Sequence, residues 1–223
     1  MELKTIAKVE CGFPTKFGLP RQSGLADIPA KIVFEKEYSD ENAFRGLEGY
    51  SHIWVVWGFS GIEQKEWSPT VRPPRLGGNV RMGVFATRSP FRPNPIGLSC
   101  VRITGVEKVG DRMVVCVTGA DFMNGTPVYD IKPYLPHADC VEARGGFSDK
   151  VKDYALSVQF QEGVGECLDE KERELLVSVL SQDPRPSYIQ NGERVFGFLW
   201  EGKEIKFCVQ DDKLTVVGIE VVK

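Results

Sequence analysis

The segment Ser51–Phe59 has the sequence SHIWVVWGF and is almost wholly apolar. Aromatic and β-branched residues dominate it, which is typical of a β-strand, and the unbroken apolar run predicts burial on both faces. A buried helix is the alternative, but nine residues are few for one. We therefore expect a strand here, with the rest of the fold arranged around it.

Further short runs on either side of this segment predict more strands, each bounded by Gly, Asp or Pro. They are Leu3–Val9, Ala30–Tyr38, Val80–Thr87, Leu98–Val106 and Arg112–Thr118. Ser39 or Asp40 is expected to cap a short helix, and Gly110-Asp111 predicts a hairpin turn. Because strands do not alternate with long helices, a doubly wound sheet is disfavoured and a closed barrel is expected.

The charged stretch Asp149–Asp153 predicts a boundary between two domains. Beyond it the sequence predicts a strand, an amphipathic helix and then a three-stranded meander. These elements are Tyr154–Phe160, Asp169–Gln182, Arg194–Trp200, Glu204–Gln210 and Leu214–Val222. The prediction is a mainly β protein, with a β-barrel-like domain at residues 1–147 and a small α+β domain at residues 148–223.

Composition narrows the class of protein. The 223 residues carry a net charge of -3, which excludes an overall basic protein but allows a local basic face. No apolar run reaches membrane-spanning length and the N-terminus lacks a signal-peptide layout, so a cytoplasmic location is expected. The six cysteines form no C-x-x-C pair and only His52 and His137 could join them, so we expect free thiols and no metal site.

The stretch Gly83–Ser99 carries Arg88 and Arg92 on a loop interrupted by three prolines. Proline fixes its own φ and pushes the preceding residue towards extended conformations, so the loop is expected to be stiff. A rigid surface connection with solvated arginines is one interpretation. A second segment rich in proline and glycine, Pro73–Asn79, favours a binding site instead.

Other motifs of known chemistry are missing. Neither Gly77-Gly78 nor Gly145-Gly146 belongs to a dinucleotide-binding or phosphate-binding glycine pattern. His52 alone is better explained as a partly buried histidine bonded to a backbone carbonyl than as a catalytic base. Asp121 and Asp130 are either acid-base groups or turn formers.

Several segments together resemble one family, the TrmO tRNA N6-methyltransferases, which act on threonylcarbamoyladenosine beside the anticodon. The segments are Pro20–Gln22, Gly49–Trp54, Pro73–Gly77, the Arg88 loop and Asn124–Tyr134. Asp183–Tyr188 resembles the family's C-terminal motif, so the resemblance extends over nearly the whole chain.

The resemblance implies a β-barrel methyltransferase that uses S-adenosylmethionine and forms a homodimer, with the cofactor near the subunit interface. It also implies a tRNA partner. By resemblance the cofactor contacts fall on Pro20, Arg21, Gln22, His52, Ile53, Arg88, Leu98, Asp121, Phe122, Met123 and Asn124. The chain departs from the family at Asn124, where relatives often have an acidic residue or histidine.

Chemistry suggests roles for further residues. The substrate nitrogen is a poor nucleophile, so we expect a base or orienting group, and Asp130 and Tyr134 are the candidates. Arg92 or Arg75 is expected to pair with the carboxylate of the modified base. A phosphate-facing patch is expected at Arg72, Arg75, Arg81, Arg88 and Arg92.

Three alternatives remain open from the sequence. The C-terminal domain either adds tRNA contacts through Arg185 and Tyr188 or only stabilises the protein. The chain is either an enzyme or a module that binds an anionic small molecule without catalysis. As an enzyme, it either methylates tRNA or acts on another substrate.

Overall fold

The computed structural model describes residues 2–61, 67–73, 76, 80–150, 152–185 and 194–222. Six strands close into a barrel in the order β1-β2-β7-β6-β3-β8. All neighbouring barrel strands pair antiparallel, and β1 meets β8 to complete the closure. The predicted mainly β fold with a barrel in the first part of the chain is confirmed.

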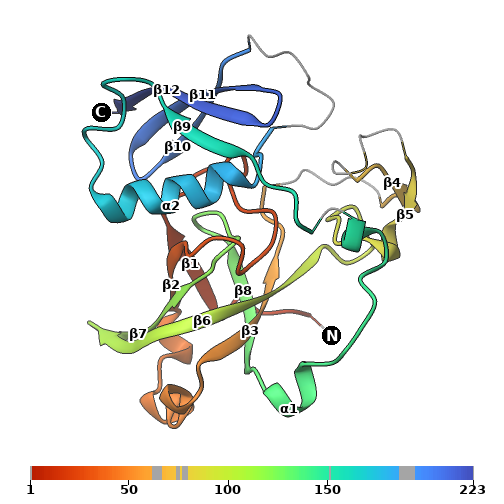
Figure 1. The fold of residues 1–223 in the computed structure, drawn as a ribbon. Coiled ribbons are helices and arrows are strands. Elements are labelled where there is room, and N and C mark those ends of the chain that lie inside the picture. The colour runs from red at the N-terminus through yellow and green to blue at the C-terminus, as the bar shows by residue number, and fades with distance from the viewer. Residues whose placement is uncertain are drawn as a thin grey trace.

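The barrel strands are β1 Ala7–Cys11, β2 Pro29–Phe34, β3 His52–Gly58, β6 Ile96–Val109, β7 Arg112–Thr118 and β8 Pro127–Pro133. Short 3-10 helices lie between them: η1 Lys36–Tyr38, η2 Glu41–Phe44, η3 Leu47–Gly49 and η5 Val84–Ala86. A two-stranded ribbon of β4 Thr70–Val71 and β5 Met82–Gly83 stands away from the barrel (Figure 1). The chain then leaves the barrel through α1 Pro136–Asp139 and η6 Gly146–Lys150.

The second part of the chain forms a four-stranded sheet in the order β10-β11-β12-β9. Its elements are β9 Ser157–Phe160, α2 Glu170–Ser181, β10 Phe196–Trp200, β11 Lys203–Gln210 and β12 Lys213–Val221. The predicted meander and helix are confirmed, and Asp169 and Glu172 form a capping box at the start of α2. Within the described part of the chain, no helix combines the length and apolarity that a membrane crossing requires.

Strand β3 shows how the sequence builds the barrel. Ile53, Val55 and Trp57 point into the core and are 8% exposed or less, whereas the alternate residues His52 and Trp54 are half-buried. The prediction of burial on both faces is therefore wrong for the outer face. A barrel encloses one side of each strand, so an apolar outer face is left for other partners.

Some predicted boundaries are also wrong. Instead of a strand over Val80–Thr87, only β5 pairs, because η5 follows at once and its Val84 N–H bonds to Pro69 O at 3.0 Å. The first strand begins at Ala7 rather than Leu3, and the second gives way to η1 after Phe34. Strand β8 lies in the segment Asn124–Tyr134, where the sequence predicted no strand.

An aromatic seam joins the barrel to the C-terminal sheet. The segment after β1 carries Phe13, which stacks on Phe198 at a centroid distance of 6.3 Å. Phe17 contacts Phe196, Phe198 and Phe207 at 6.3 to 6.4 Å. The buried apolar residues of both parts thus form one continuous core.

We expect Gly97→Ala to destabilise the protein by about 1 to 3 kcal/mol, because a Cβ at this position of β6 overlaps the buried Trp57 ring. Gly105→Ala in the same strand is the matched control, since its Cβ meets nothing closer than Cys116 Cβ at 3.9 Å. Urea unfolding measures both free energies. Equal losses in the two variants would contradict the packing of Trp57 against Gly97.

Candidate functional site

Three segments distant in sequence converge on a group that we call the Arg88 cluster: Gln22, Ser23, Arg88, Ser99 and Asp121. Arg88 Nη1 donates a hydrogen bond to Gln22 Oε1. Ser99 Oγ donates to Asp121 Oδ1 at 2.7 Å, and the backbone N–H of Ser23 bonds to the same carboxyl group. The cluster therefore offers a guanidinium, an amide and a carboxylate in one place.

Asp121 sits in a partly desolvated position. Burial raises the pKa of its carboxyl group, whereas the hydrogen bonds from Ser99 and Ser23 and the charge of Arg88 act in the opposite direction. Trp57 Nε1 donates to Ser99 Oγ at 2.9 Å, which leaves the Ser99 hydroxyl hydrogen for Asp121. A polar chain thus runs from the barrel core to the site.

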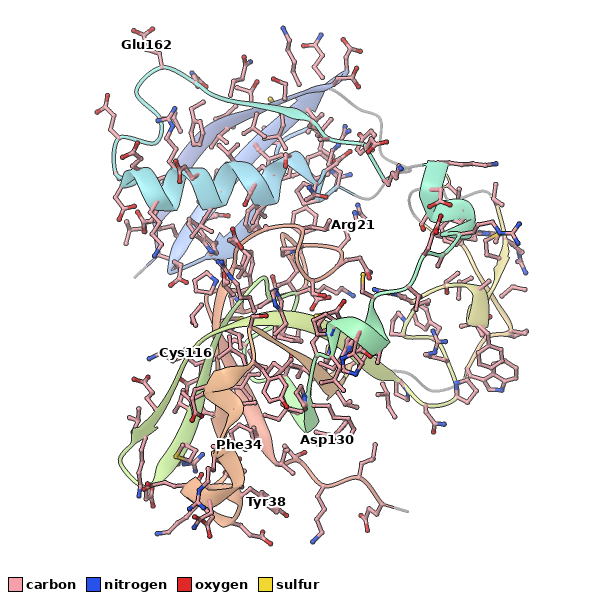
Figure 2. All side chains as sticks on the ribbon, turned by 60° about the horizontal axis from the view of Figure 1, so that its bottom comes forward. Arg21, Phe34, Tyr38, Cys116, Asp130 and Glu162 are labelled. Atoms are coloured by element: carbon pink, nitrogen blue, oxygen red, sulfur yellow. The ribbon has the colours of Figure 1, made fainter. Side chains whose placement is uncertain are left out.

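Arg21 connects this cluster to the C-terminal domain. Its Nη2 donates to the carbonyl oxygens of Asp183 and Arg185, both at 2.8 Å. Gln22 Nε2 donates in turn to Arg21 O at 2.5 Å, so a hydrogen-bonded chain leads from the C-terminal domain to Arg88. Figure 2 shows Arg21 at the junction between the two domains. The Arg21 guanidinium is therefore hydrogen-bonded across the junction between the two domains.

The two carbonyls that receive Arg21 are held in place by the Asp183 side chain. Its carboxylate binds Arg185 Nε at 2.8 Å and Nη2 at 3.0 Å, and Tyr154 Oη donates to it at 2.8 Å. Burial raises the pKa of Asp183, but the hydrogen bonds from Arg185 and Tyr154 outweigh it and leave the pKa lowered. Asp183 also has a φ of 51°, a left-handed conformation that is unfavourable outside glycine.

A second group, the Tyr134 cluster, lies on the outer face of the barrel and contains His52, Trp54, Tyr134 and Asp139. The Tyr134 ring is 6.2 Å from that of His52 and 5.8 Å from that of Trp54. Trp54 Nε1 donates to Asp139 Oδ2 at 3.0 Å. Partial burial, followed by the Cys140 thiol, raises the pKa of the Tyr134 hydroxyl, so this phenol stays protonated at neutral pH.

The two clusters meet along β6. Trp54 pairs with Cys100 across the β3–β6 ladder, and the Cys100 N–H donates to Ser23 Oγ at 3.2 Å. Leu98, which is 54% exposed, lies on the same outer face opposite Val56. The predicted residues His52, Leu98, Gln22 and Arg88 are thus brought to one side of the barrel.

Other predicted cofactor residues have structural side-chain environments. Ile53 and Phe122 are buried in the core, where Phe122 packs on Trp57 at 5.6 Å. Asn124 Oδ1 accepts from the Cys11 N–H at 3.2 Å and holds the end of β1. Pro20 is buried, and Met123 lies against Gly61. These residues offer backbone atoms more readily than side chains.

Two of the three predicted catalytic residues, Asp130 and Tyr134, are not adjacent in the structure. Asp130 pairs with Val56 and Tyr134 bonds to His52, so they lie four residues apart along the strand direction, roughly 13 Å. Asp130 forms an ion pair with Lys132 at 2.9 Å. Figure 2 shows it on the barrel wall, away from Arg21.

Arg92 folds back onto its own loop. Its Nη1 donates to Thr87 O at 2.9 Å and Ser89 O at 3.3 Å. The other arginine predicted to bind the modified base, Arg75, lies outside the described residues, as does Tyr188.

Sequence reasoning missed Ser23 and Ser99, which orient Asp121, and the bonding of Asp183 to Tyr154. Ser99 closes the Gly83–Ser99 stretch, but nothing in that pattern predicts its partner. Among the described residues, no group of three or more His, Cys, Asp or Glu is arranged to hold a metal ion. A hollow at the other end of the barrel, lined by Asp40, Glu41, Glu48 and Glu107 among others, contains none of the predicted site residues.

Comparisons with known proteins cover both parts of the chain. The family model of the tRNA-methyltransferase O N-terminal domain matches residues 8–140, and that of the TrmO C-terminal domain matches residues 153–222. The tRNA (adenine(37)-N6)-methyltransferase of Escherichia coli (strain K12) is 39% identical over 229 residues, which covers 98% of this chain and 97% of the relative.

Two further comparisons concern a cofactor-binding protein and a solved structure. An S-adenosyl-L-methionine-binding protein of Archaeoglobus fulgidus is 38% identical over 146 residues, covering 66% of this chain and 98% of the relative. A crystal structure of TrmO from Pseudomonas aeruginosa superposes with a TM-score of 0.79 at 29% identity, covering 99% of this chain and 97% of that one. The similarity therefore includes sequence, domain order and fold.

We expect Asp121 and Asp183 to change stability with pH in opposite directions. The raised pKa of Asp121 means that the folded state holds this proton more tightly, so its contribution to the free energy of unfolding falls as pH rises above about 4. The lowered pKa of Asp183 gives a contribution that is present above the unfolded-state pKa and is lost as pH falls through the folded-state pKa.

Urea unfolding of Asp121→Asn and Asp183→Asn between about pH 3 and pH 8 measures both trends. Relative to the unmodified protein, Asp121→Asn gains stability as pH rises, whereas Asp183→Asn loses it. The same trend in both variants would show that the two carboxyl groups do not have these environments.

Proposed function

The chain belongs to the tRNA-methyltransferase O family, and from that premise we propose that it transfers the methyl group of S-adenosylmethionine to N6 of an adenosine beside the anticodon of tRNA. The relatives' names support the reaction and the cofactor. The observation that carries the proposal is the convergence of Gln22, Arg88 and Asp121. We propose threonylcarbamoyladenosine as the substrate base.

The donor set of the Arg88 cluster fits S-adenosylmethionine. Arg88 is suited to the methionine carboxylate, because a guanidinium binds a carboxylate through charge-assisted hydrogen bonds. Asp121 is suited to the ribose hydroxyls or the sulfonium charge, and Leu98, which precedes Ser99 in β6, offers an exposed apolar surface. When bound, S-adenosylmethionine supplies an electrophilic methyl group.

We assign different roles to the two candidate bases, Tyr134 and Asp130. Tyr134 stays protonated at neutral pH, so it orients the substrate by donating a hydrogen bond rather than removing the N6 proton. Asp130 is half-buried, with Val56 between it and Leu98 in the sheet, and is the better proton acceptor. Asp130→Asn should lower kcat with little change in cofactor affinity, and an unchanged kcat would remove it as the base.

Arginine side chains are suited to bind the negatively charged groups of the substrate. We assign the carboxylate of the threonylcarbamoyl group to Arg92, and the tRNA phosphates to Arg72 and Arg81. Arg185 is bonded to Asp183, so we assign it to the domain junction rather than to tRNA.

The two domains have different roles in the proposed function. We propose that residues 1–147 hold the cofactor and that residues 148–223 support the site from the other side of the junction. A homodimer is supported by the exposed apolar residues Ile96 and Leu98 on the outer face of β6, and sedimentation velocity tests it. A cytoplasmic location follows from a tRNA substrate.

Incubation with methyl-labelled S-adenosylmethionine and total tRNA tests the function. We expect label in N6-methylated threonylcarbamoyladenosine after digestion to nucleosides. Label only in unmodified adenosine would contradict the proposed substrate base. Cofactor binding without transfer to any RNA would leave a binding module or an enzyme with another substrate.

Arg88→Ala tests the site. Loss of a charge-assisted pair with the cofactor carboxylate is expected to weaken S-adenosylmethionine binding at least tenfold, corresponding to about 1.5 to 3 kcal/mol. Arg112→Ala is the control, because Arg112, at the start of β7, forms an ion pair with Glu35, which directly follows β2. Arg112 does not belong to the Arg88 cluster. Calorimetry measures both affinities, and unchanged binding by a folded Arg88→Ala variant would refute the assignment.

A further inference from the structure

The ribbon β4–β5 and the loop after it form a projection that we call the arginine arm, described at residues 67–73 and 80–92. It stands away from the barrel wall in both views (Figures 1 and 2). From residue 67 to residue 92 the sequence contains five arginines and no Asp, Glu, Lys or His. In a chain of net charge -3, this is a strong local concentration of positive charge.

The arm also exposes aromatic rings. Phe85 is 72% exposed, Trp67 is 49% exposed and Phe91 is 44% exposed. The rings of Trp67 and Phe85 are nearly parallel, with an interplanar angle of 23° and a centroid distance of 6.5 Å. Arg92 lies over the Phe85 ring at 5.8 Å. An exposed cluster of this kind indicates an interaction site rather than a feature of the core.

Backbone bonds hold these rings in place before anything binds. The Val84 N–H donates to Pro69 O at 3.0 Å, and the Ser68 N–H donates to Phe91 O at 3.3 Å. Val84 itself is only 1% exposed and anchors the arm. Binding to a fixed surface loses less conformational entropy, so the arm is prepared for a ligand.

We propose that the arginine arm binds an unpaired nucleotide of the tRNA loop that contains the target adenosine, with its base stacked on Trp67 and Phe85 and its phosphates paired with Arg72 and Arg81. This inference rests on the proposed function for the identity of the RNA. Exposed aromatic faces combined with arginines are the means by which proteins bind single-stranded RNA.

Charge favours RNA over a second copy of this chain. A symmetric contact between two arms brings arginines against arginines with no acidic residue from the arm between them, which costs free energy. A polyanion instead releases its counterions when it meets the same surface. The linker between the two domains adds no net negative charge that could offset these arginines, since Glu142 and Asp149 are balanced by Arg144 and Lys150.

Binding of a fluorescein-labelled anticodon stem-loop RNA, followed by anisotropy at several salt concentrations, tests the arm. Phe85→Ala and Trp67→Ala are each expected to weaken binding by roughly 5- to 150-fold without changing the salt dependence, because they remove stacking alone. Arg81→Gln is expected to lower the slope of log affinity against log salt by about 0.7. Val109→Ala, at a residue 55% exposed at the end of β6, is the control and should bind as the unmodified protein does.

The outcomes separate the arm from the enzyme's activity. S-adenosylmethionine affinity should be unchanged in both aromatic variants, because neither residue touches the Arg88 cluster. Unchanged RNA affinity in folded Phe85→Ala and Trp67→Ala variants would overturn the proposal. Dissociation of a dimer in these variants would assign the surface to a second copy and overturn it too. If the unmodified protein binds the RNA through the arm but transfers no methyl group, the proposed function fails and the arm assignment stands.

Discussion

The aromatic seam between the barrel and the C-terminal sheet is the contact on which the other features depend. Phe13 and Phe17 lie in the segment that leaves β1, and they pack on rings from β10 and β11. Burial of several aromatic side chains is non-directional and strong, so it fixes the distance between the two parts without defining a polar geometry. The polar geometry comes from Arg21, which follows the seam in sequence and reaches across it to two carbonyl oxygens.

This arrangement gives the C-terminal domain a role beyond stability. A buried ion pair such as Asp183–Arg185 contributes little net stability, because desolvation offsets the attraction between the charges. It does determine the backbone conformation, since Asp183 keeps a positive φ while its carboxylate is bonded by Arg185 and Tyr154. Unfavourable backbone conformations that persist in this way are concentrated at functional sites. The carbonyl oxygens of this turn thereby accept hydrogen bonds from Arg21. Gln22 bonds both to Arg21 and to Arg88, so it links Arg88 to the same turn.

Local patterns in the sequence predicted much of the fold but little of the site. The strand β7, the capped helix α2 and the C-terminal meander follow from neighbouring residues, and their predictions are confirmed. Strand β8 was missed because Pro127 and Pro133 bracket it, and proline at a strand end reads as a turn. The partner of Arg21 is 162 residues away, so no local pattern contains it. The folding back of Arg92 onto Thr87 and Ser89 depends on loop geometry that composition does not specify.

The loop between η5 and β6 joins the two surfaces that the proposed reaction needs. Side-chain and backbone bonds among Thr87, Ser89 and Phe91 brace it, and its prolines restrict the backbone further. Arg88 extends from this loop to Gln22 in the cofactor cluster, whereas Arg92, four residues later, lies over Phe85 on the arm. Because the segment between them is stiff, the spacing of the two guanidinium groups is set before either ligand binds. A methyl donor held by the first and an RNA loop held by the second would meet with their relative positions already constrained, which is the condition under which proximity accelerates a transfer reaction.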